Sequence, residues 1–402
     1  MEIKNTPYKM LDPENCVMCG MCLNNCPTYN ISNNESESPR GRISIIHGLN
    51  ESMLEPSQSA LSHINSCTLC LACESICPAK VNFYQLITDA RNKYFKKQKM
   101  LFKVKTQLVS FLLTKSYLKK TIINIFNILN KKPLKKIFKF MNFIQLENIE
   151  ANNNIINKKQ NKNEVGIFLG CASAIFQKNV ANDCMQILKK NNISSRIIEN
   201  VECCGSLDYN SGKINKGIKH KEKLIKEFRE KDYKKIIAYA SGCSAFINKN
   251  VGNIDYQDAT SYILEVLLNS NDNNFKITKK NICVHKPCTS KLANIDFDKL
   301  ITLLNNIPDL NISVFEDNYC CGAGAQNLIH NKENSLNIIK PKIDYIMSNN
   351  IEYVLTYNVG CSLNFINSLN INGINTTKVL HPITFLNKIL IKLKNTQVLI
   401  NY

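Results

Sequence analysis

The feature that most constrains the fold of this 402-residue chain is a cysteine spacing that occurs twice near its start. The two copies read CVMCGMCLNNCP and CTLCLACESICP, so both follow the pattern C-x2-C-x2-C-x3-C-P. Three thiols at intervals of three residues must lie together in a tight loop, and such a loop is predicted to fold around a metal. The cysteines are Cys16, Cys19, Cys22 and Cys26 in the first copy, and Cys67, Cys70, Cys73 and Cys77 in the second.

The spacing indicates iron rather than zinc. Structural zinc sites usually take their ligands as two separated pairs at tetrahedral corners. Three close thiols followed by a distant Cys-Pro are typical of a 4Fe-4S cluster, and in two-cluster domains the fourth cysteine ligates the other cluster. We therefore expect two 4Fe-4S clusters with crossed ligands. The alternatives are two zinc knuckles, or clusters that only stabilise a small domain. The expected ligands are Cys16, Cys19, Cys22 and Cys77 for the first cluster, and Cys26, Cys67, Cys70 and Cys73 for the second.

The segment between the two motifs contains a pair of arginines in the sequence SPRGRI. Arg40 and Arg42 could hold a loop near the first cluster or meet a partner protein. Ordinary surface arginines are the alternative.

The second half of the chain repeats its cysteines after 117 or 118 residues. Both copies carry the tripeptide CCG, and both carry a glycine directly before the last thiol. Four thiols per copy suffice for one further cluster each, and the backbone N–H groups of a CCG turn could bond to sulfur. A redox-active dithiol, or vacated ligand positions, are the alternatives. The cysteines are Cys171, Cys203, Cys204 and Cys243 in the first copy, and Cys288, Cys320, Cys321 and Cys361 in the second.

The surroundings of these thiols predict an α/β fold. Apolar runs at 165–169 and 282–284 precede the first cysteine of each copy, and runs at 236–240 and 353–357 precede the last. Helical patterns such as 184–190 and 297–304 lie between them, and this alternation is typical of mainly parallel sheets. The thiols would then lie at the carboxyl ends of strands, where such sheets form their sites. We expect the two copies to face each other across a pseudo-twofold axis.

Three other residues in this half fall outside the repeating pattern. Cys184 and Cys283 are interpreted as buried thiols. His285 is interpreted as an ordinary loop histidine, although it could donate a hydrogen bond to a cluster sulfur.

A basic segment separates the two halves. Residues 93–146 contain fourteen lysines and no Asp or Glu, and their apolar residues fall near helical spacing. Such helices can lie on an anionic membrane surface or pack on the protein itself. The net charge of +19 favours an anionic partner, but a Lys-rich composition with five arginines and no Trp explains it equally. Residues 147–163 are polar and predict a linker.

The expected architecture has several domains. A small α+β or α-helical ferredoxin-type di-cluster domain spans 1–100, and basic helices and a linker span 101–163. Two α/β CCG repeats follow at 164–275 and 276–402. No apolar run is long enough to span a membrane, and no apolar leader is seen. We expect the protein in the cytoplasm or peripherally on the inner face of the cell membrane.

A ferredoxin-type pair followed by two CCG repeats resembles the heterodisulfide-reductase-related iron–sulfur subunits, and most of all the glycolate oxidase iron–sulfur subunits. The matching stretches are 26–29, 39–43, 67–70, 203–209, 240–246 and 358–361. The resemblance implies a chain that carries electrons from FAD-binding subunits, which oxidise glycolate to glyoxylate, towards membrane quinone. One departure is that the fullest CCG repeats end in Cys-x-x-Cys, where this chain has Phe246 and Asn364.

The sequence adds support for a role without substrate chemistry. It contains no phosphate-cradling glycine loop and no paired acid and base. We therefore expect no catalytic residue, no flavin on this chain and no nucleic-acid partner. The rival functions are an equivalent subunit for lactate or glycerol-3-phosphate, a heterodisulfide-reductase-like thiol–disulfide subunit, and a zinc or nucleic-acid-binding protein.

Overall fold

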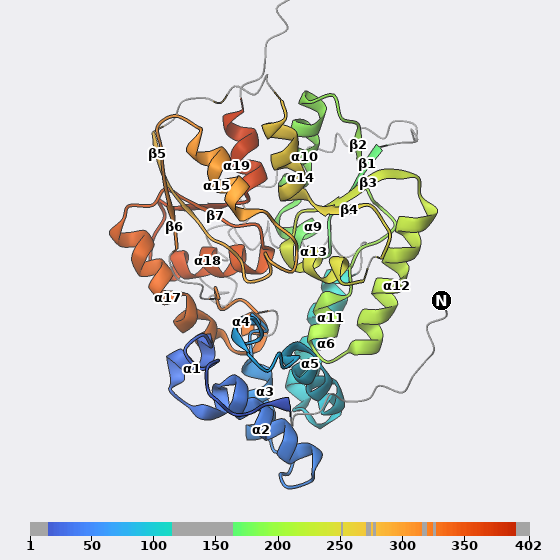
Figure 1. Ribbon diagram of the computed structural model, residues 1–402, viewed down its shortest axis with the longest axis vertical. Helices are drawn as coiled ribbons and strands as arrows, with labels where there is room; N and C mark the ends of the chain where they lie inside the picture. Colours follow the sequence, from blue (N-terminus) through green and yellow to red (C-terminus); the bar gives the residue numbers. More distant parts are fainter. Residues whose placement is uncertain are drawn as a thin grey trace, which may run out of the picture.

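The computed structural model describes residues 15–114, 164–250, 252–270, 275, 279–315, 320–324 and 327–390. A helical part lies at one end of the molecule, and two α/β repeats lie side by side above it (Figure 1). The predictions made for residues 115–163, which cover most of the basic segment and the polar linker, fall outside the described residues.

The amino-terminal part, residues 15–114, is helical, and its described residues contain no strand. Of the two forms expected for this domain, the structure therefore has the α-helical one. Its small core is formed by Ile46, Leu61, Ile64 and Ile87, each at most 1% exposed. The elements are α1 (Pro27–Ser32), η2 (Glu35–Glu37), α2 (Pro39–Asn50), α3 (Gln58–Ser66), α4 (Ala72–Ile76), α5 (Phe83–Lys93), η3 (Phe95–Lys97) and α6 (Met100–Thr114).

The first repeat contains a sheet of four parallel strands in the order β2-β1-β3-β4. The central strands are short apolar runs, as the sequence predicted, and Val165, Ile167 and Ile237 are fully buried in them. The elements are β1 (Glu164–Phe168), α9 (Ser173–Phe176), α10 (Lys178–Lys190), β2 (Ser195–Ile197), α11 (Ser206–Asn210), α12 (Ile214–Glu230), β3 (Tyr233–Ala238), α13 (Ser241–Asn248), β4 (Tyr256–Asp258) and α14 (Ala259–Leu268).

The second repeat has the same topology, with four parallel strands in the order β6-β5-β7-β8. The predicted α/β class with parallel sheets is therefore confirmed for both repeats, whereas the pseudo-twofold relation stays a prediction. The elements are β5 (Lys280–Val284), α15 (Phe297–Asn305), β6 (Leu310–Val314), α16 (Asn327–His330), α17 (Lys332–Ser348), β7 (Tyr353–Leu355), α18 (Val359–Ile371), β8 (Lys378–Leu380) and α19 (Pro382–Ile389).

The two repeats share one large apolar core. Helices α10 and α14 of the first repeat pack against α19 and α15 of the second, between the two sheets (Figure 1). Below this core the repeats also meet near their last cysteines, where Asn358 Nδ2 donates to Ser241 Oγ at 3.0 Å. The carboxyl ends of β3 and β7 are thereby held together.

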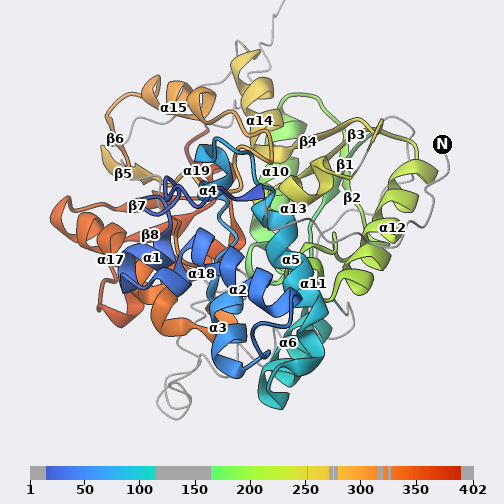
Figure 2. The ribbon, with the colours of Figure 1, turned by 60° about the horizontal axis from the view of Figure 1, so that its bottom comes forward.

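The helical part contacts both repeats (Figure 2). On the side of the first repeat, Tyr84 Oη of α5 donates to Asn210 Oδ1 at 2.8 Å. On the side of the second repeat, Gly324 packs so closely on the second cysteine motif that an added Cβ would lie 2.4 Å from Thr68 O. The second motif is therefore fixed against the second repeat.

Candidate metal centres

The first centre lies in a shallow hollow at the surface of the helical part. Its lining contains all three loop cysteines of the first motif together with the last cysteine of the second motif, and these are Cys16, Cys19, Cys22 and Cys77. The structure thus brings together the four thiols that the crossed arrangement requires. Burial raises the pKa of Cys22, so this thiol stays protonated unless a cation lies beside it.

Arg40 fixes the backbone of the first loop. Its Nη1 donates to Met18 O at 3.0 Å, and its Nε pairs with Glu35 Oε1 at 2.6 Å. The loop turns through Gly20, which has φ +80°, and an added Cβ there would lie 2.7 Å from Arg40 Nη1. Of the alternatives for this arginine, the structure supports the loop-holding one.

The second centre is more deeply buried. Cys26, Cys67 and Cys73 are at most 9% exposed. Burial raises the pKa of Cys73, and the sulfurs of Cys70, Cys67 and Cys26 raise it further. Cys26 of the first motif therefore lies among the thiols of the second motif. The Leu69 N–H also points at this centre and lies 3.4 Å from Cys67 Sγ.

Two buried guanidinium groups flank the second centre. Arg42 Nη1 lies 3.9 Å from Cys26 Sγ, and its Nη2 pairs with Glu37 Oε2 at 2.5 Å. Arg91 Nη2 donates to Cys67 O at 2.7 Å, and burial lowers the pKa of Arg91 to about 10. Arg42 is thus not a surface arginine. Arg91 was missed in the sequence, since nothing in its local pattern distinguishes it from an exposed helix residue.

The third centre lies at the carboxyl ends of β1 and β3 in the first repeat. Cys203 Sγ lies 3.7 Å from Cys171 Sγ, and Cys204 is hydrogen-bonded to Cys203 and Cys243. Cys171, Cys203 and Cys204 are buried, whereas Cys243 is partly exposed. All four predicted thiols of this copy are therefore together.

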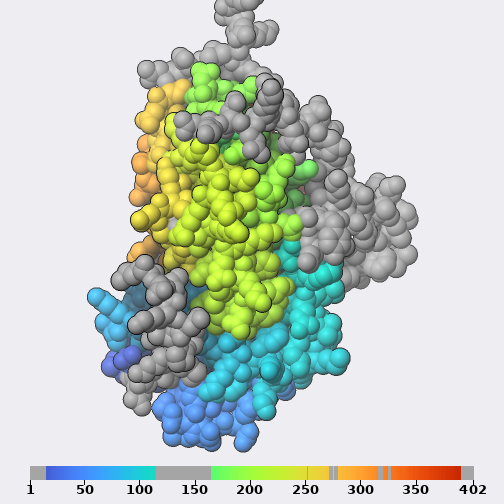
Figure 3. Space-filling model, turned by 90° about the vertical axis from the view of Figure 1, so that its right-hand side faces the viewer, coloured from blue at the N-terminus to red at the C-terminus, as the bar shows by residue number. Residues whose placement is uncertain are grey.

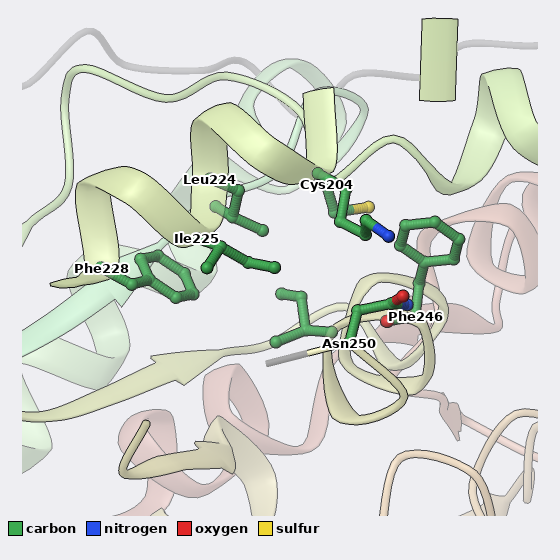
Figure 4. Close-up of a pocket in the computed structure, with 8 residues that line it drawn as sticks. Cys204, Leu224, Ile225, Phe228, Phe246 and Asn250 are labelled. Atoms are coloured by element: carbon green, nitrogen blue, oxygen red, sulfur yellow. Dashed lines mark hydrogen bonds between the residues drawn. The ribbon is translucent and has the colours of Figure 1, made fainter. Parts of the chain in front are cut away.

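Figure 4 shows the apolar surroundings of Cys204. A small hollow beside this residue is lined by Leu224, Ile225 and Phe228 of α12 and by Phe246 of α13. Phe246 stands where a Cys-x-x-Cys ending would have placed another thiol, so the third centre has an apolar wall on this side.

The fourth centre lies at the equivalent strand ends of the second repeat. Cys321 Sγ lies 2.8 Å from Cys361 Sγ, and Cys320 is hydrogen-bonded to Cys288. Three of these thiols are buried and Cys288 is exposed. Asn364 occupies the position where a Cys-x-x-Cys ending would have its second cysteine, and its Nδ2 donates to Cys321 O at 2.6 Å.

The second and fourth centres touch each other. A hydrogen bond between Cys70 and Cys320 raises the pKa of Cys70 well above its ordinary value. The same group of sulfurs includes Cys288, which interacts with both Cys320 and Cys70. No sequence pattern predicted this contact, because the residues lie about 250 positions apart in the chain.

The glycine of each CCG tripeptide is required by backbone geometry. Gly205 has φ +95° and Gly322 has φ +74°, a region that residues with a Cβ rarely adopt. A Cβ would also lie 2.2 Å from Gly217 O in the first repeat and 2.5 Å from Ser335 O in the second. In this conformation the Gly205 and Gly322 N–H groups lie 3.3 Å and 3.4 Å from the sulfur two residues earlier.

The remaining residues singled out in the sequence are buried. Cys184 and Cys283 lie at 0% exposure in apolar cores, as predicted. His285 differs from its interpretation as an ordinary loop histidine, because it is 2% exposed and packs against Phe315 and Phe365. The sequence signal that could have found it is its position at the end of a buried strand.

These thiol groups fit metal clusters. In the second and fourth groups several sulfurs lie close together: the neighbouring Cys320 thiol and burial raise the pKa of Cys70 and Cys288, and burial raises the pKa of Cys361. Several thiolates so close together would repel each other, whereas a bound metal deprotonates its thiols outright and compensates their charge. Each of the four groups contains four cysteine thiols, and cysteine thiolates are the usual ligands of iron–sulfur clusters.

The described part of the basic segment has an unusual orientation. On α6 the polar side chains of Thr106, Ser110 and Thr114 are buried against the repeats, whereas the apolar side chains Met100 and Leu108 are 77% and 52% exposed. Leu101, Val104 and Phe111 are exposed as well. Figure 3 shows this part of the chain at the surface below the first repeat. Among the described residues, no helix has the length and apolar character needed to span a membrane.

Comparison with known proteins assigns the domains. A 4Fe-4S dicluster domain matches residues 12–81, and a cysteine-rich domain of the CCG type matches residues 165–248 and 282–366. The chain is 24% identical over 391 residues to the probable glycolate oxidase iron-sulfur subunit of Bacillus subtilis (strain 168), covering 87% of each chain. It is also 24% identical over 386 residues to the glycolate oxidase iron-sulfur subunit of Escherichia coli (strain K12), covering 86% of this chain and 88% of that one.

A second group of relatives matches less of the chain. Lactate utilization protein A 1 of Bacillus mycoides (strain KBAB4) is 25% identical over 217 residues, which is 49% of this chain and 86% of that protein. These matches confirm the resemblance inferred from the cysteine motifs and the order of the domain types.

Proposed function

We propose that this chain, an iron–sulfur protein with a 4Fe-4S dicluster domain followed by two cysteine-rich CCG domains, is the electron-transfer subunit of a glycolate oxidase complex. The redox partner would be an FAD-binding subunit that oxidises glycolate to glyoxylate. The reaction releases two electrons and two protons, which the flavin takes up together. The present chain would pass the electrons on singly towards quinone and would carry neither flavin nor a catalytic residue.

The observation that carries this proposal is the interlacing of the two cysteine motifs in one small domain. Cys77 lines the same hollow as Cys16, Cys19 and Cys22, and Cys26 lies among the thiols of the second motif. These two groups of four would hold the two 4Fe-4S clusters, and such clusters supply one-electron transfer. The eight thiols of the CCG repeats would hold the additional clusters.

The residues around the second centre favour the uptake of negative charge there. Arg42 and Arg91 bring two buried positive charges to its edge, and Glu37 compensates only the first of them among the described contacts. The potential of a cluster rises with nearby positive charge and with N–H bonds to its sulfurs. We therefore place the second centre at a higher potential than the first, whose neighbour Arg40 is paired with Glu35 at the surface.

The contact between Cys70 and Cys320 supports an order of centres within the chain. The first centre is exposed and would accept electrons from the flavin partner. The second centre lies behind it, and the fourth centre touches the second. Electrons would thus pass from the surface of the dicluster domain into the second repeat.

Glycolate is favoured over lactate by the extent of the matches. The glycolate oxidase iron-sulfur subunits match 86–88% of this chain and of their own chains, whereas the lactate utilization protein matches 49% of this chain. Because the identity to these subunits is only 24%, glycolate is our proposal for the substrate and is not taken from the relatives' names.

We further propose that α6 meets an anionic membrane surface. Its apolar residues point outward, and residues 93–114 carry six lysines and no acidic residue. An exposed apolar stripe flanked by lysines is the pattern of an interfacial helix, which binds through buried apolar area and attraction to anionic lipid. This position would bring the chain to the quinone of the membrane.

The test is anaerobic capture of the tagged chain from its host, followed by substrate addition. We expect a brown complex that contains FAD. The iron–sulfur absorption of this complex at about 400 nm should be bleached by glycolate. Bleaching by lactate or glycerol-3-phosphate, but not glycolate, would assign the chain to a sister complex. Disulfide reduction by the chain without flavin would assign it to thiol–disulfide chemistry, and a colourless zinc protein would contradict the proposal altogether.

A further inference from the structure

The two CCG repeats differ at one buried position beside their thiols. Phe168 ends β1 and lies three residues before Cys171, and it is fully buried. His285 directly follows β5 and lies three residues before Cys288, and it is 2% exposed. The second repeat therefore has an imidazole where the first repeat has a phenyl ring, although the two sheets have the same topology.

The surroundings of His285 are apolar on most sides. The ring of Phe365 lies edge-on to the imidazole with the centroids 5.1 Å apart, and the ring of Phe315 does so at 6.2 Å. His285 Nδ1 shares a hydrogen bond with Thr356 Oγ1 at 3.0 Å. Nε2 is buried and has no hydrogen-bond partner among the described residues. A buried ring nitrogen without a partner is unfavourable, so its retention in an aromatic pocket needs an explanation.

The thiols of the fourth centre supply that explanation. A ring nitrogen of His285 and the sulfurs of Cys321 and Cys361 all lie within 4.8 Å of one another. Since Nδ1 is already bonded to Thr356, Nε2 is the nitrogen left for a ligand. A metal-bound histidine almost always donates its other N–H to a neighbouring acceptor, and the Thr356 hydroxyl is such an acceptor.

We propose that His285 Nε2 is a ligand of the metal centre of the second repeat, together with Cys321 and Cys361. The first repeat, with Phe168 at this position, would hold its centre through sulfur alone. This inference rests on the proposed function, because it requires a metal centre in the second repeat. It adds that the two repeats are chemically unequal and that the fourth centre has mixed nitrogen and sulfur ligands.

The consequence is a direction for electron flow. An imidazole ligand is neutral, so a cluster that His285 helps to hold carries less negative charge than one whose ligands are all thiolates, and its potential is higher. The fourth centre touches the second through Cys70 and Cys320. It would therefore be the better acceptor of the two CCG centres, and the only one in contact with the dicluster domain among the described thiols.

The experiment uses the full-length chain reconstituted anaerobically with iron and sulfide, from cells grown with natural or ¹⁵N-labelled histidine. Iron per chain is counted, and nitrogen couplings to the paramagnetic centres are recorded by pulsed EPR in the oxidised and reduced states. The test variant is His285→Phe, which copies the residue of the first repeat and keeps the aromatic packing. The control is His330→Phe, since His330 stacks on Phe102 away from the thiols.

We expect more than about eight irons per chain and a histidine coupling that shifts with ¹⁵N. The coupling should be lost in His285→Phe, retained in His330→Phe, and lost without loss of iron in His285→Cys, which restores a ligand. More than about eight irons without any histidine coupling would overturn the ligand assignment and leave the proposed function standing. About eight irons or fewer would overturn the metal centre of the repeat itself, and with it the assignment.

Discussion

Arg91 offers the sharpest prediction about what holds the second centre in place. Its guanidinium nitrogens lie within hydrogen-bond distance of four backbone carbonyls, which belong to Ile64, Asn65, Cys67 and Asn210. Ile64 and Asn65 lie in the last turn of α3, where the helix has no intrahelical donors left for its carbonyls. Arg91 thus caps α3, fixes the first cysteine of the second motif, and joins the dicluster domain to the first repeat.

The substitution Arg91→Met removes all of these bonds. Four buried carbonyls lose their donor, and at about 2 kcal/mol each the loss is about 8 kcal/mol. The wild-type protein, however, bears the cost of burying the charge, which lowers the pKa of Arg91 from 12.5 to about 10. That shift corresponds to about 3 kcal/mol, which the variant recovers. We therefore expect a net loss of about 5 kcal/mol in the free energy of unfolding of the dicluster domain.

The assay is iron retention and circular dichroism during anaerobic urea titration. A loss of this size lowers the urea midpoint of the dicluster domain by about 2 M. The matched control is Arg229→Met, because Arg229 is exposed on α12. If Arg91→Met keeps both its iron and its midpoint at the values of the control, the capping argument is wrong.

Three further predictions address other parts of the molecule. Burial raises the pKa of Asp258 from 3.8 to about 6, so its ionised form destabilises the fold increasingly as the pH rises between these values. Asp258→Asn should accordingly stabilise the protein by about 1.4 kcal/mol more at pH 8 than at pH 5, and equal effects in urea titrations at both pH values would refute this. Gly324→Val should separate the second motif from the second repeat, because the valine side chain would clash with Thr68 O. Proteolysis of the dicluster domain should then be faster, and an unchanged rate would contradict the contact. Leu108→Glu combined with Phe111→Glu should reduce co-sedimentation with vesicles of anionic phospholipid, and unchanged binding would exclude α6 as the membrane surface.

The cysteine groups could be predicted because short intervals between cysteines in the sequence indicate which thiols lie together. Intervals of three residues force Cys16, Cys19 and Cys22 into one loop, whatever the rest of the chain does. The partner thiol Cys77 followed from the known geometry of such motifs, and the structure places it in the same hollow. The strands before Cys171 and Cys288 could be predicted for a similar reason. Short apolar runs that end close to a cysteine fit buried parallel strands.

The contacts between the parts of the chain could not be predicted in this way. Arg42 and Arg91 are buried only because the dicluster helices pack around them, and no local pattern indicates which helix face will be covered. The approach of Cys70 to Cys320 depends on how the dicluster domain is seated on the second repeat. The orientation of α6 is a further case. The helical spacing of its apolar residues predicts an apolar face, but it does not indicate whether that face packs on the protein or points to solvent.

His285 is a residue close to the motifs whose buried position the sequence did not indicate. In the sequence it stands just ahead of Cys288 in a predicted strand–turn segment, where an ordinary loop histidine is the simplest interpretation. Only the strand register, which ends β5 one residue earlier, places its ring in the aromatic pocket beside Cys321 and Cys361.

The central claim is that these groups of thiols hold iron–sulfur clusters that carry single electrons. It is tested most directly by counting iron and acid-labile sulfide in the anaerobically purified chain and recording its EPR spectrum after reduction with dithionite. The account predicts about eight irons and eight sulfides for the dicluster domain, additional iron for the CCG repeats, and paramagnetic signals in the reduced protein. A chain that contains zinc, or that stays free of any EPR signal after reconstitution with iron and sulfide and reduction, would contradict it.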